Sequence, residues 1–279
     1  MAAATKILLL GAAGRMGQAI TRLVAGGAVP GLELAGAIDR ADSPLIGQDA
    51  GAAAGVRALG VRVSADLGAA LAARPAVAVD FSFHAATAAA APQLAAAGVP
   101  WVVGTTGLDA AERGAVEQAA GRIPVVLSAN MSVGVNLLHA LVAQAARVLR
   151  GRGYDCEIVE RHHRRKKDAP SGTALYLGEA AAQGFGWNLA DVAIDGRSGL
   201  PGERPEKQIG FHAVRGGDLV GDHTVLFAAD GECLELSHRA TSRDTLAIGA
   251  LRAAAWLPGH APGLYGMRDV LGLVPGASA

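Results

Sequence analysis

The hydrophobic residues near the start of the chain form a short run that ends at a glycine. Residues 6 to 10 read Lys-Ile-Leu-Leu-Leu, and Gly11 follows. A strand covered on both faces in a parallel sheet has such a continuous apolar pattern. A helical pattern from about Met16 to Ala25 and a second apolar run from Leu32 to Ile38 come next. The pattern therefore predicts a strand–helix–strand unit that ends at Asp39.

The same alternation continues up to about residue 127. Strands are predicted at 77–83, 99–103 and 124–127, and helices at 85–97 and 109–120. Strands that alternate with helices are typical of a parallel sheet, whose ligands gather at the carboxyl ends of the strands. We therefore expect an α/β fold with a Rossmann-like dinucleotide-binding domain at the N-terminus.

The pattern changes after Asn130. A long helix is predicted at about 135–149, strands at 154–160, 208–215, 223–228 and 232–238, and a further helix at 244–257. Gly-Gly-Asp and Asp-Gly turns join the later strands, which favours hairpins. We expect a second α+β domain built on a mostly antiparallel sheet. The domains would be 1–130, completed by 244–279, and 131–243, the latter for substrate binding and oligomerisation.

Composition and charge narrow the class of protein. Of the 279 residues, 51% are hydrophobic and 18% charged, which suits a globular protein of one or two domains. Lysine plus arginine equals aspartate plus glutamate at 25 each, so net charge attracts neither nucleic acid nor an anionic membrane. The two cysteines, Cys156 and Cys233, indicate a reducing compartment, and the start reads as a buried strand rather than a signal peptide. We expect a cytoplasmic protein.

The first motif that carries chemistry is the turn Gly11-Ala12-Ala13-Gly14-Arg15-Met16-Gly17. Glycine allows positive φ and close approach of a pyrophosphate, whose charge the N–H groups at a helix start favour. Its position after an apolar strand predicts a dinucleotide site, although a merely tight turn is the alternative. Asp39, at the end of the second strand, could accept hydrogen bonds from the ribose of NAD, whereas Arg40 could bind the 2′-phosphate of NADP.

Two further loops follow predicted strands. They are Gly104-Thr105-Thr106-Gly107 and Ser128-Ala129-Asn130-Met131. Both offer amides and hydroxyls at the edge of the sheet, where a nicotinamide would lie. Small polar residues at strand ends are commonplace, so neither loop alone decides the function.

The most specific segment runs from Glu160 to Thr173. Its sequence is Glu-Arg-His-His-Arg-Arg-Lys-Lys-Asp-Ala-Pro-Ser-Gly-Thr, and residues 161–167 are all basic or imidazole-bearing. Such a local field suits a ligand with carboxylates, and the Pro-Ser-Gly-Thr end can open a helix that holds one of them. A solvated basic face is the main alternative. Nucleic acid is disfavoured because no aromatic residues are interleaved, and a metal site because the adjacent histidines lack ligand spacing.

This segment resembles the signature of the 4-hydroxy-tetrahydrodipicolinate reductase family, Glu-x-His-His-x-x-Lys-x-Asp-x-Pro-Ser-Gly-Thr, at every fixed position. The likeness extends in family order over nearly the whole chain, through the glycine turn and the segments 104–107, 130–136, 215–223, 237–243 and 267–271. Ala13 and Arg165 are minor departures.

The resemblance implies a role for each matching residue. His162 would be the general acid and Lys166 a second proton donor, while His163, Gly172 and Thr173 would bind the substrate. Gly11 to Met16, Asp39 and Arg40 would hold the dinucleotide, with the nicotinamide against Gly104 to Thr106 and Ser128 to Met131.

The resemblance also implies the reaction, the cofactor and the assembly. The substrate would be a cyclic dicarboxylate on the lysine and diaminopimelate pathway, the cofactor NADH or NADPH without a metal, and the assembly a homotetramer that binds neither nucleic acid nor membrane. The domains would close in turnover about hinges near 130–133 and 242–244. Two rivals stay open at this point, namely another amino-acid reductase, such as an aspartate or homoserine dehydrogenase-like protein, and a non-catalytic dinucleotide sensor.

Overall fold

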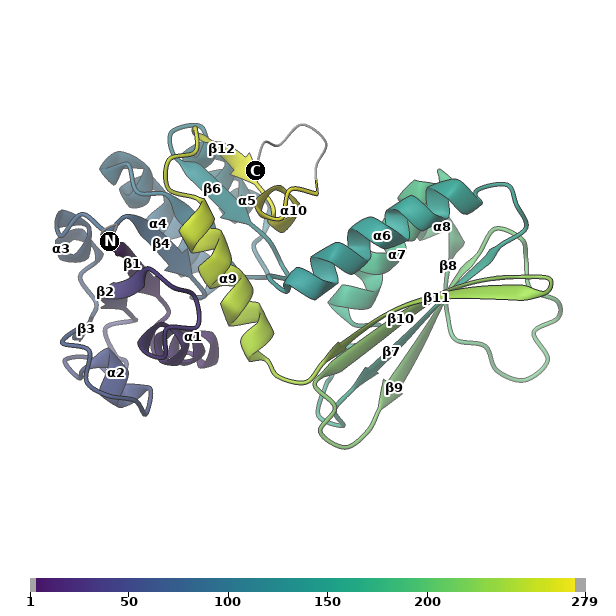
Figure 1. The fold of residues 1–279 in the computed structure, drawn as a ribbon, viewed down its shortest axis with the longest axis horizontal. Coiled ribbons are helices and arrows are strands. Elements are labelled where there is room, and N and C mark those ends of the chain that lie inside the picture. Colours follow the sequence, from purple (N-terminus) through teal and green to yellow (C-terminus); the bar gives the residue numbers. More distant parts are fainter. Residues whose placement is uncertain (1–3, 274–279) are drawn as a thin grey trace. The chain divides into compact units, whose positions relative to one another are not determined.

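The computed structural model describes residues 4–273, which form two compact units (Figure 1). The first unit extends up to Val133 and resumes at Asp244, and the second is Gly134–Arg243. The chain thus crosses between the units twice.

The first unit is a parallel sheet of seven strands in the order β12-β6-β5-β4-β1-β2-β3. Its strands are β1 (Thr5–Leu10), β2 (Leu32–Ile38), β3 (Val63–Ser64), β4 (Val77–Asp80), β5 (Trp101–Val103), β6 (Pro124–Leu127) and β12 (Gly263–Tyr265). Its helices are α1 (Arg15–Ala25), α2 (Ala50–Ala53), α3 (Leu67–Ala72), α4 (His84–Ala97), α5 (Ala110–Ala120), α9 (Asp244–Trp256) and α10 (Met267–Val270).

The apolar run of β1 is continuous because its two faces feed two separate cores. Ile7 and Leu9 pack with α1 and α9, whereas Leu8 and Leu10 pack with α4 and α5. Ile7, Leu8 and Leu9 are fully buried. The α/β, Rossmann-like prediction for this unit is confirmed.

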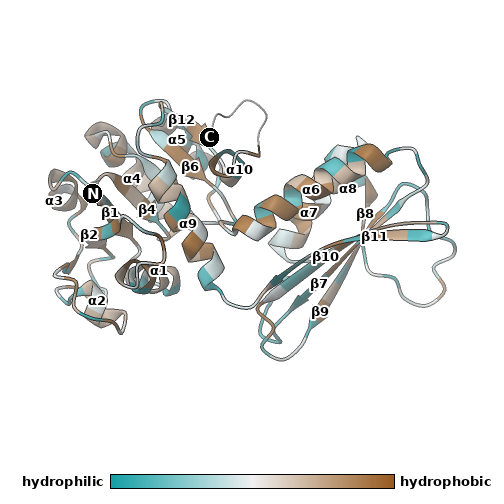
Figure 2. Cartoon of the chain, viewed as in Figure 1, coloured by the Kyte–Doolittle hydropathy of each residue, from teal (hydrophilic) through white to brown (hydrophobic). Residues whose placement is uncertain are grey.

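The second unit is a five-stranded sheet in the order β11-β10-β7-β9-β8. Its elements are α6 (Val133–Leu149), β7 (Asp155–His162), α7 (Gly172–Phe185), α8 (Leu189–Val192), β8 (Ala193–Asp195), β9 (Ile209–Arg215), β10 (Gly221–Ala229) and β11 (Glu232–Ala240). Helices α6 and α7 pack on one face of this sheet. Figure 2 shows hydrophilic colour at the ends of β7 and β10 that lie beyond this core.

The prediction of a mostly antiparallel second sheet is wrong, because this sheet is mixed. Strand β10 runs antiparallel to β7 and β11, but β9 runs parallel to both β7 and β8. Helices α7 and α8 lie on the crossover from β7 to β8, and the 196–208 loop then leads from β8 to β9, so each of the three strands runs in the same direction. The Asp-Gly turn at 230–231 closes a true hairpin, whereas Gly-Gly-Asp at 216–218 leads from β9 to β10, which lie on opposite sides of β7. Turn residues alone could not distinguish these two connections.

One carboxylate pins the long 196–208 loop to the face of the second sheet opposite α6 and α7. Glu157 on β7 accepts hydrogen bonds from Arg197 at 2.9 and 2.8 Å, from Arg204 at 2.9 Å and from His212 at 2.6 Å. Burial alone would raise the pKa of Glu157, but these hydrogen bonds outweigh it and lower the pKa from 4.5 to about 2.

Replacing Glu157 by glutamine is therefore expected to lower stability in a pH-dependent way. A carboxyl whose pKa is depressed by folding stabilises the fold above its ordinary pKa, and this contribution disappears as the pH falls through the folded value. The difference in unfolding free energy between wild type and Glu157→Gln should be greatest above about pH 5 and shrink towards pH 2. Denaturant titrations across this range measure it. Glu117→Gln, which breaks an exposed ion pair with Arg113, should show little difference at any pH, and a pH-independent loss in Glu157→Gln would contradict the assignment.

Candidate active site

The glycine turn after β1 forms a cradle of bare backbone. Gly11 has φ +80°, and a Cβ there would lie 2.6 Å from the carbonyl oxygen of Phe81. A Cβ on Gly17 would lie 2.2 Å from the carbonyl oxygen of Gly11, so α1 packs directly on the turn. Gly14 is the N-cap of α1 and has no side chain that could cap it. The first-turn N–H groups of α1 therefore face a position suited to an anion.

Asp39 and Arg40 follow β2 beside this cradle. The Asp39 carboxylate accepts hydrogen bonds from the backbone N–H of Ala13 at 2.6 Å and of Arg40 at 2.9 Å. The N–H of Ala13 is therefore already engaged inside the protein. The guanidinium of Arg40 lies 3.2 Å from Asp42 in a pair in which both side chains are 75% exposed. It is free to exchange Asp42 for another anion.

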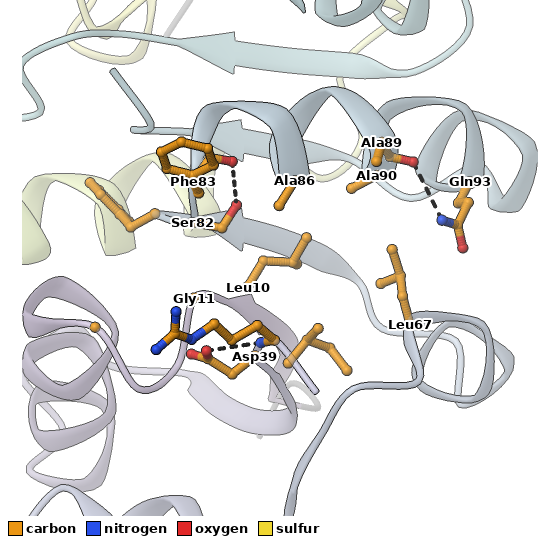
Figure 3. Close-up of a pocket in the computed structure, with 14 residues that line it drawn as sticks. Leu10, Gly11, Asp39, Leu67, Ser82, Phe83, Ala86, Ala89, Ala90 and Gln93 are labelled. Carbon is orange, nitrogen blue, oxygen red and sulfur yellow. Dashed lines mark hydrogen bonds between the residues drawn. The ribbon is translucent and has the colours of Figure 1, made fainter. Parts of the chain in front are cut away.

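A pocket of about 390 Å³ lies between this cradle and α4. Figure 3 shows Gly11 and Asp39 on one side of it, with Ala86 and Ala90 of α4 on the other. Its walls are mainly apolar, and its polar groups are few. An apolar slot with a carboxylate at its rim suits a nucleoside whose ring is buried and whose ribose hydroxyls point to the acid.

The two strand-end loops differ in what they offer to a ligand. In Gly104–Gly107, Thr105 is buried and Thr106 is exposed. A Cβ on Gly104 would lie 2.2 Å from the ring of Phe81, so this position needs glycine.

In the loop 128–131, the hydroxyl of Ser128 donates to the carbonyl of Asn130 at 2.8 Å, while the side chain of Met131 is buried in the core. Met131 can therefore offer only backbone. A second cavity of about 430 Å³ is lined by Thr105, Thr106, Ser128 and Ala129, among others.

In the second unit, a fully buried carboxylate organises the basic segment. Glu160, at the end of β7, accepts two hydrogen bonds from the guanidinium of Arg215, both at 2.7 Å. It also accepts the backbone N–H of Ser171 at 3.0 Å. Burial raises the pKa of Glu160, but the hydrogen bonds from Arg215 and His162 have the larger combined effect and lower it. Glu160 is therefore ionised at neutral pH.

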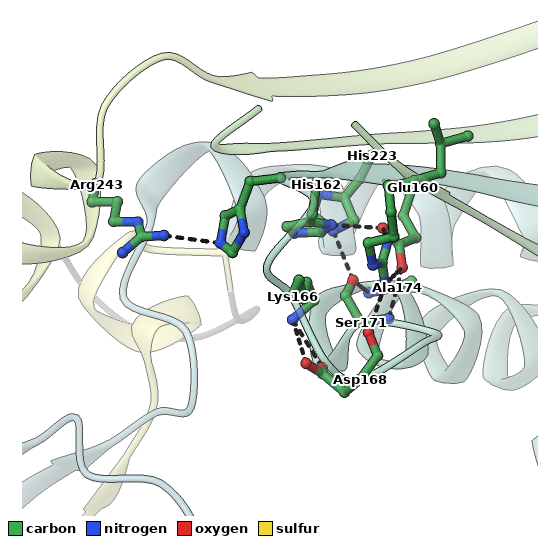
Figure 4. A network of polar contacts seen from close by, with 11 residues as sticks. Glu160, His162, Lys166, Asp168, Ser171, Ala174, His223 and Arg243 are labelled. Atoms are coloured by element: carbon green, nitrogen blue, oxygen red, sulfur yellow. Dashed lines mark hydrogen bonds and ion pairs between the residues drawn. The ribbon is translucent and has the colours of Figure 1, made fainter. Parts of the chain in front are cut away.

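His162 is oriented by this carboxylate. Its Nδ1 lies 2.6 Å from Oε2 of Glu160 (Figure 4). An ionised carboxylate only accepts hydrogen bonds, so Nδ1 of His162 carries a proton. Nε2 is left as the atom that can exchange a proton with a ligand, as in other carboxylate–histidine pairs.

His223 on β10 lies beside His162, with ring centroids 5.1 Å apart. Its Nε2 lies 3.0 Å from the hydroxyl of Ser171. Burial, followed by the charge of His162, lowers the pKa of His223 to about 4. At neutral pH His223 is thus an uncharged imidazole beside His162.

The remaining predicted residues surround His162. Nζ of Lys166 donates to both oxygens of Asp168, at 2.9 and 2.8 Å. Nε2 of His163 lies 3.0 Å from the guanidinium of Arg243. Burial and the charge of Arg243 lower the pKa of His163, so it is neutral.

Gly172 and Thr173 begin α7, which is capped by Ser171. The hydroxyl of Ser171 accepts the N–H of Ala174 at 3.2 Å. Gly172 is exposed, and a Cβ there would meet nothing within 4 Å. The start of α7 is therefore open to an anionic group.

The predicted residues thus fall into two sets. One is the glycine cradle of the first unit with its neighbouring loops, and the other is the cluster around His162 in the second unit. Sequence reasoning assigned no role to Glu160, Arg215, His223, Arg243 or Asp80. Asp80 ends β4, and Glu160 lies two residues before the end of β7, positions at which a polar residue could have been noticed. Arg215, His223 and Arg243 lie on other segments, so only the fold brings them to the site.

No group of three or more histidine, cysteine, aspartate or glutamate side chains within residues 4–273 is placed to hold a metal ion. None of the helices there has the length and hydrophobicity needed to cross a membrane.

Comparison with known proteins gives consistent matches over nearly the whole chain. Residues 5–131 match the family model described as dihydrodipicolinate reductase, N-terminus, and residues 134–271 match dihydrodipicolinate reductase, C-terminus. A 4-hydroxy-tetrahydrodipicolinate reductase of Anaeromyxobacter dehalogenans is 56% identical over 96% of this chain and 98% of its own. The corresponding reductase of Thiobacillus denitrificans is 54% identical, with 96% and 98% covered.

Solved structures agree on the fold. The dipicolinate-bound dihydrodipicolinate reductase of Paenisporosarcina sp. TG-14 has a TM-score of 0.75 at 21% identity, covering 94% of this chain and 97% of its own. An amine dehydrogenase from Mycobacterium smegmatis has a TM-score of 0.57 at 15% identity, with 93% and 94% covered.

Proposed function

Since the chain belongs to the dihydrodipicolinate reductase family, it is a nicotinamide-dependent 4-hydroxy-tetrahydrodipicolinate reductase of lysine and diaminopimelate biosynthesis, and we propose that His162 is its general acid. The other-reductase and sensor alternatives are set aside by this membership. The observation that supports the proposed role is the contact of 2.6 Å between His162 and buried Glu160.

The balance of protons in the reaction explains why a general acid is needed. The reduced nicotinamide supplies a hydride, the substrate takes up one proton, and its hydroxyl group leaves as water. Glu160 holds Nδ1 of His162, so Nε2 faces the ligand and delivers the proton. Lys166 is the second donor in this proposal.

Recognition of two carboxylates accounts for the rest of the cluster. One carboxylate would lie at the start of α7, on Gly172 and Thr173, where helix N–H groups favour negative charge. The other substrate carboxylate would replace Asp168 as the partner of Lys166. The side chain of Asp168 is 61% exposed, so it can turn into solvent when the substrate binds. His163 would contact the substrate as a neutral imidazole.

We assign the cofactor to the first unit. The pyrophosphate would lie on Gly11, Ala12, Ala13, Gly14, Arg15 and Met16, the adenine ribose on Asp39 and Arg40, and the nicotinamide against Gly104, Thr105, Thr106, Ser128, Ala129, Asn130 and Met131. Among these residues, Ala13 would contact the pyrophosphate without donating a hydrogen bond, because its N–H already donates to Asp39.

We propose that both NADH and NADPH serve as reductant. Asp39 can accept the ribose hydroxyls of NADH, and exposed Arg40 can turn from Asp42 to the 2′-phosphate of NADPH.

Replacing Arg40 by alanine is expected to raise the KM for NADPH by about tenfold or more, because a charge-assisted hydrogen bond to phosphate is lost. The KM for NADH should stay near its wild-type value. Steady-state kinetics with each dinucleotide measure this, with Arg22→Ala at the exposed face of α1 as a matched control. An equal effect on both cofactors would contradict the phosphate contact.

We further propose a homotetramer in the cytoplasm. Helices α6 and α7 cover one face of the second sheet, whereas on the other face Val214 is 44% exposed. The support for the tetramer is the family membership, because a single exposed apolar side chain is common on monomers as well. Sedimentation equilibrium at micromolar concentration tests the assembly, and a monomer there would contradict it.

The activity itself is tested by supplying the substrate in place, from pyruvate and aspartate semialdehyde with the preceding synthase, and following oxidation of NADH and NADPH. We expect turnover with wild type and none with His162→Ala plus Lys166→Ala. Absence of turnover from a folded wild-type protein that binds dinucleotide would overturn the proposed function.

A further inference from the structure

The segment that follows β4 contacts both cofactor loops of the first unit. The carbonyl of Phe81 lies against Gly11, and its ring lies against Gly104, so closely that a Cβ at either glycine would collide. The carbonyl of Asp80 accepts the N–H of Gly104 at 2.9 Å. Residues 80–82 therefore set the position of the glycine cradle relative to the nicotinamide loop.

The carboxyl group of Asp80 is the last acceptor in a series of hydrogen bonds between hydroxyl groups. Thr87, on the first turn of α4, donates to Thr105 at 2.9 Å, and Thr105 donates to Oδ1 of Asp80 at 3.3 Å. The hydroxyl of Ser82 lies 3.2 Å from that of Thr87, and the N–H of Ser82 returns to Oδ1 of Asp80 at 2.8 Å. The network links β4, α4 and the nicotinamide loop.

The other oxygen of Asp80, Oδ2, is buried without a hydrogen-bond partner among the described residues. Within residues 4–273 no cationic side chain pairs with this carboxyl, and burial raises the pKa of Asp80 despite the hydrogen bonds from Ser82, Thr87 and Thr105. A buried, half-satisfied carboxyl is unfavourable for folding. Such a group is retained where it serves function rather than stability.

The network also fixes what Thr105 can do. Its hydroxyl donates to Asp80 and accepts from Thr87, and its side chain is buried. The hydroxyl is therefore engaged inside the first unit, and Thr105 meets the second cavity only through its other atoms. The neighbouring Thr106 is exposed, so Thr106 and the loop backbone are the groups left for a ligand.

We propose that Asp80 is a positioning residue of the reductase, which acts by holding Thr105 as an anchor so that the backbone of 104–107 is fixed for the nicotinamide. The inference rests on the proposed function and deepens it. It assigns the hydroxyl of Thr105 to the interior, so that this residue would contact the nicotinamide through its other atoms, and it gives the buried carboxyl of Asp80 a positioning role for the cofactor.

The test is a set of paired variants assayed with NADH. Asp80→Ala and Thr105→Val each remove one end of the same hydrogen bond, and each should lower kcat/KM for the dinucleotide by about 10- to 100-fold, because a small displacement of a positioned group has that effect. The double variant should be no worse than the poorer single one, since both changes abolish one contact. The conservative variants Asp80→Asn and Thr105→Ser keep the acceptor and the donor and should restore most of the activity.

A matched control separates positioning from general destabilisation. Asp49 is another aspartate of the first unit, whose carboxylate accepts the N–H groups of Ala52, Leu59 and Gly60. Asp49→Asn should lower the melting temperature without changing the KM for NADH. Asp80→Asn should be at least as stable as wild type.

Two results would overturn the proposal. One is a double variant whose loss in kcat/KM is the product of the two single losses, and the other is an unchanged kcat/KM in Thr105→Val. An inactive wild type would instead count against the proposed function, so the two failures are distinguishable.

Discussion

Replacing His162 by glutamine is expected to lower kcat by about 10²- to 10⁴-fold, the contribution of a positioned general acid. The KM for the dinucleotide should change little, because His162 belongs to the second unit and the cofactor cradle to the first. Glutamine fills similar space and keeps a hydrogen-bonding group near Glu160, so the loss reports proton transfer. The loss in kcat is measured from steady-state and single-turnover rates, with the substrate generated in the assay by the preceding synthase.

The chain offers a close control for this variant. His212, on the strand next to β7, lies 2.6 Å from a carboxylate of that strand, Glu157, just as His162 lies 2.6 Å from Glu160. His212→Gln should therefore keep wild-type kcat. A similar loss in both variants would show that removing any histidine–glutamate pair disturbs the sheet, and the assignment of His162 as acid would not stand.

Replacing Glu160 by glutamine should have two effects that can be measured separately. The fully buried carboxylate neutralises Arg215, and removing one partner of a buried pair lowers the unfolding free energy by about 3 kcal/mol. The carboxamide no longer enforces a proton on Nδ1 of His162, so kcat should fall by about 10²-fold or more at temperatures where the variant is folded, as when the buried carboxylate of a serine-protease triad becomes an amide.

The pH profile distinguishes these effects. A purely structural role would lower the melting temperature but leave the pH dependence of kcat unchanged, whereas loss of the His162 partner alters that dependence. Glu157→Gln is the matched control, since it removes a carboxylate on the same strand but on the other face. Full activity of folded Glu160→Gln with a wild-type pH profile would contradict the positioning role.

Local pattern was sufficient for most of the first unit. The run at 6–10 is explained by two cores that meet on β1, and the glycine turn lies directly between β1 and α1. The basic segment likewise lies in one continuous piece of chain, from the end of β7 to the start of α7. The elements α2, β3, α3, β12 and α10 were not predicted, because each has only two to six residues, too few to show a clear period.

Strand direction and long-range partners could not be predicted in the same way. The parallel pairing of β9 with β7 depends on the two connections between them, through α7 and α8 to β8 and through the 196–208 loop to β9, and neither connection leaves a mark in the paired strands. The contacts of Glu160 with Arg215 and of Ser171 with His223 span 55 and 52 residues. A single sequence indicates that such groups are polar and buried, but only the sheet register shows which of them meet.

The alternation along β7 also restricts how this protein can change in evolution. Cys156 and Ile158 point into the apolar core, and Glu160 continues the same face of the strand. A single inserted residue just before Glu160 would turn the acid-bearing end of the strand towards the opposite face, although no side chain had been lost. Substitutions at outward positions such as Val159 are tolerable, whereas insertions and deletions are not. We therefore expect homologues to vary in composition along this strand while its length stays constant.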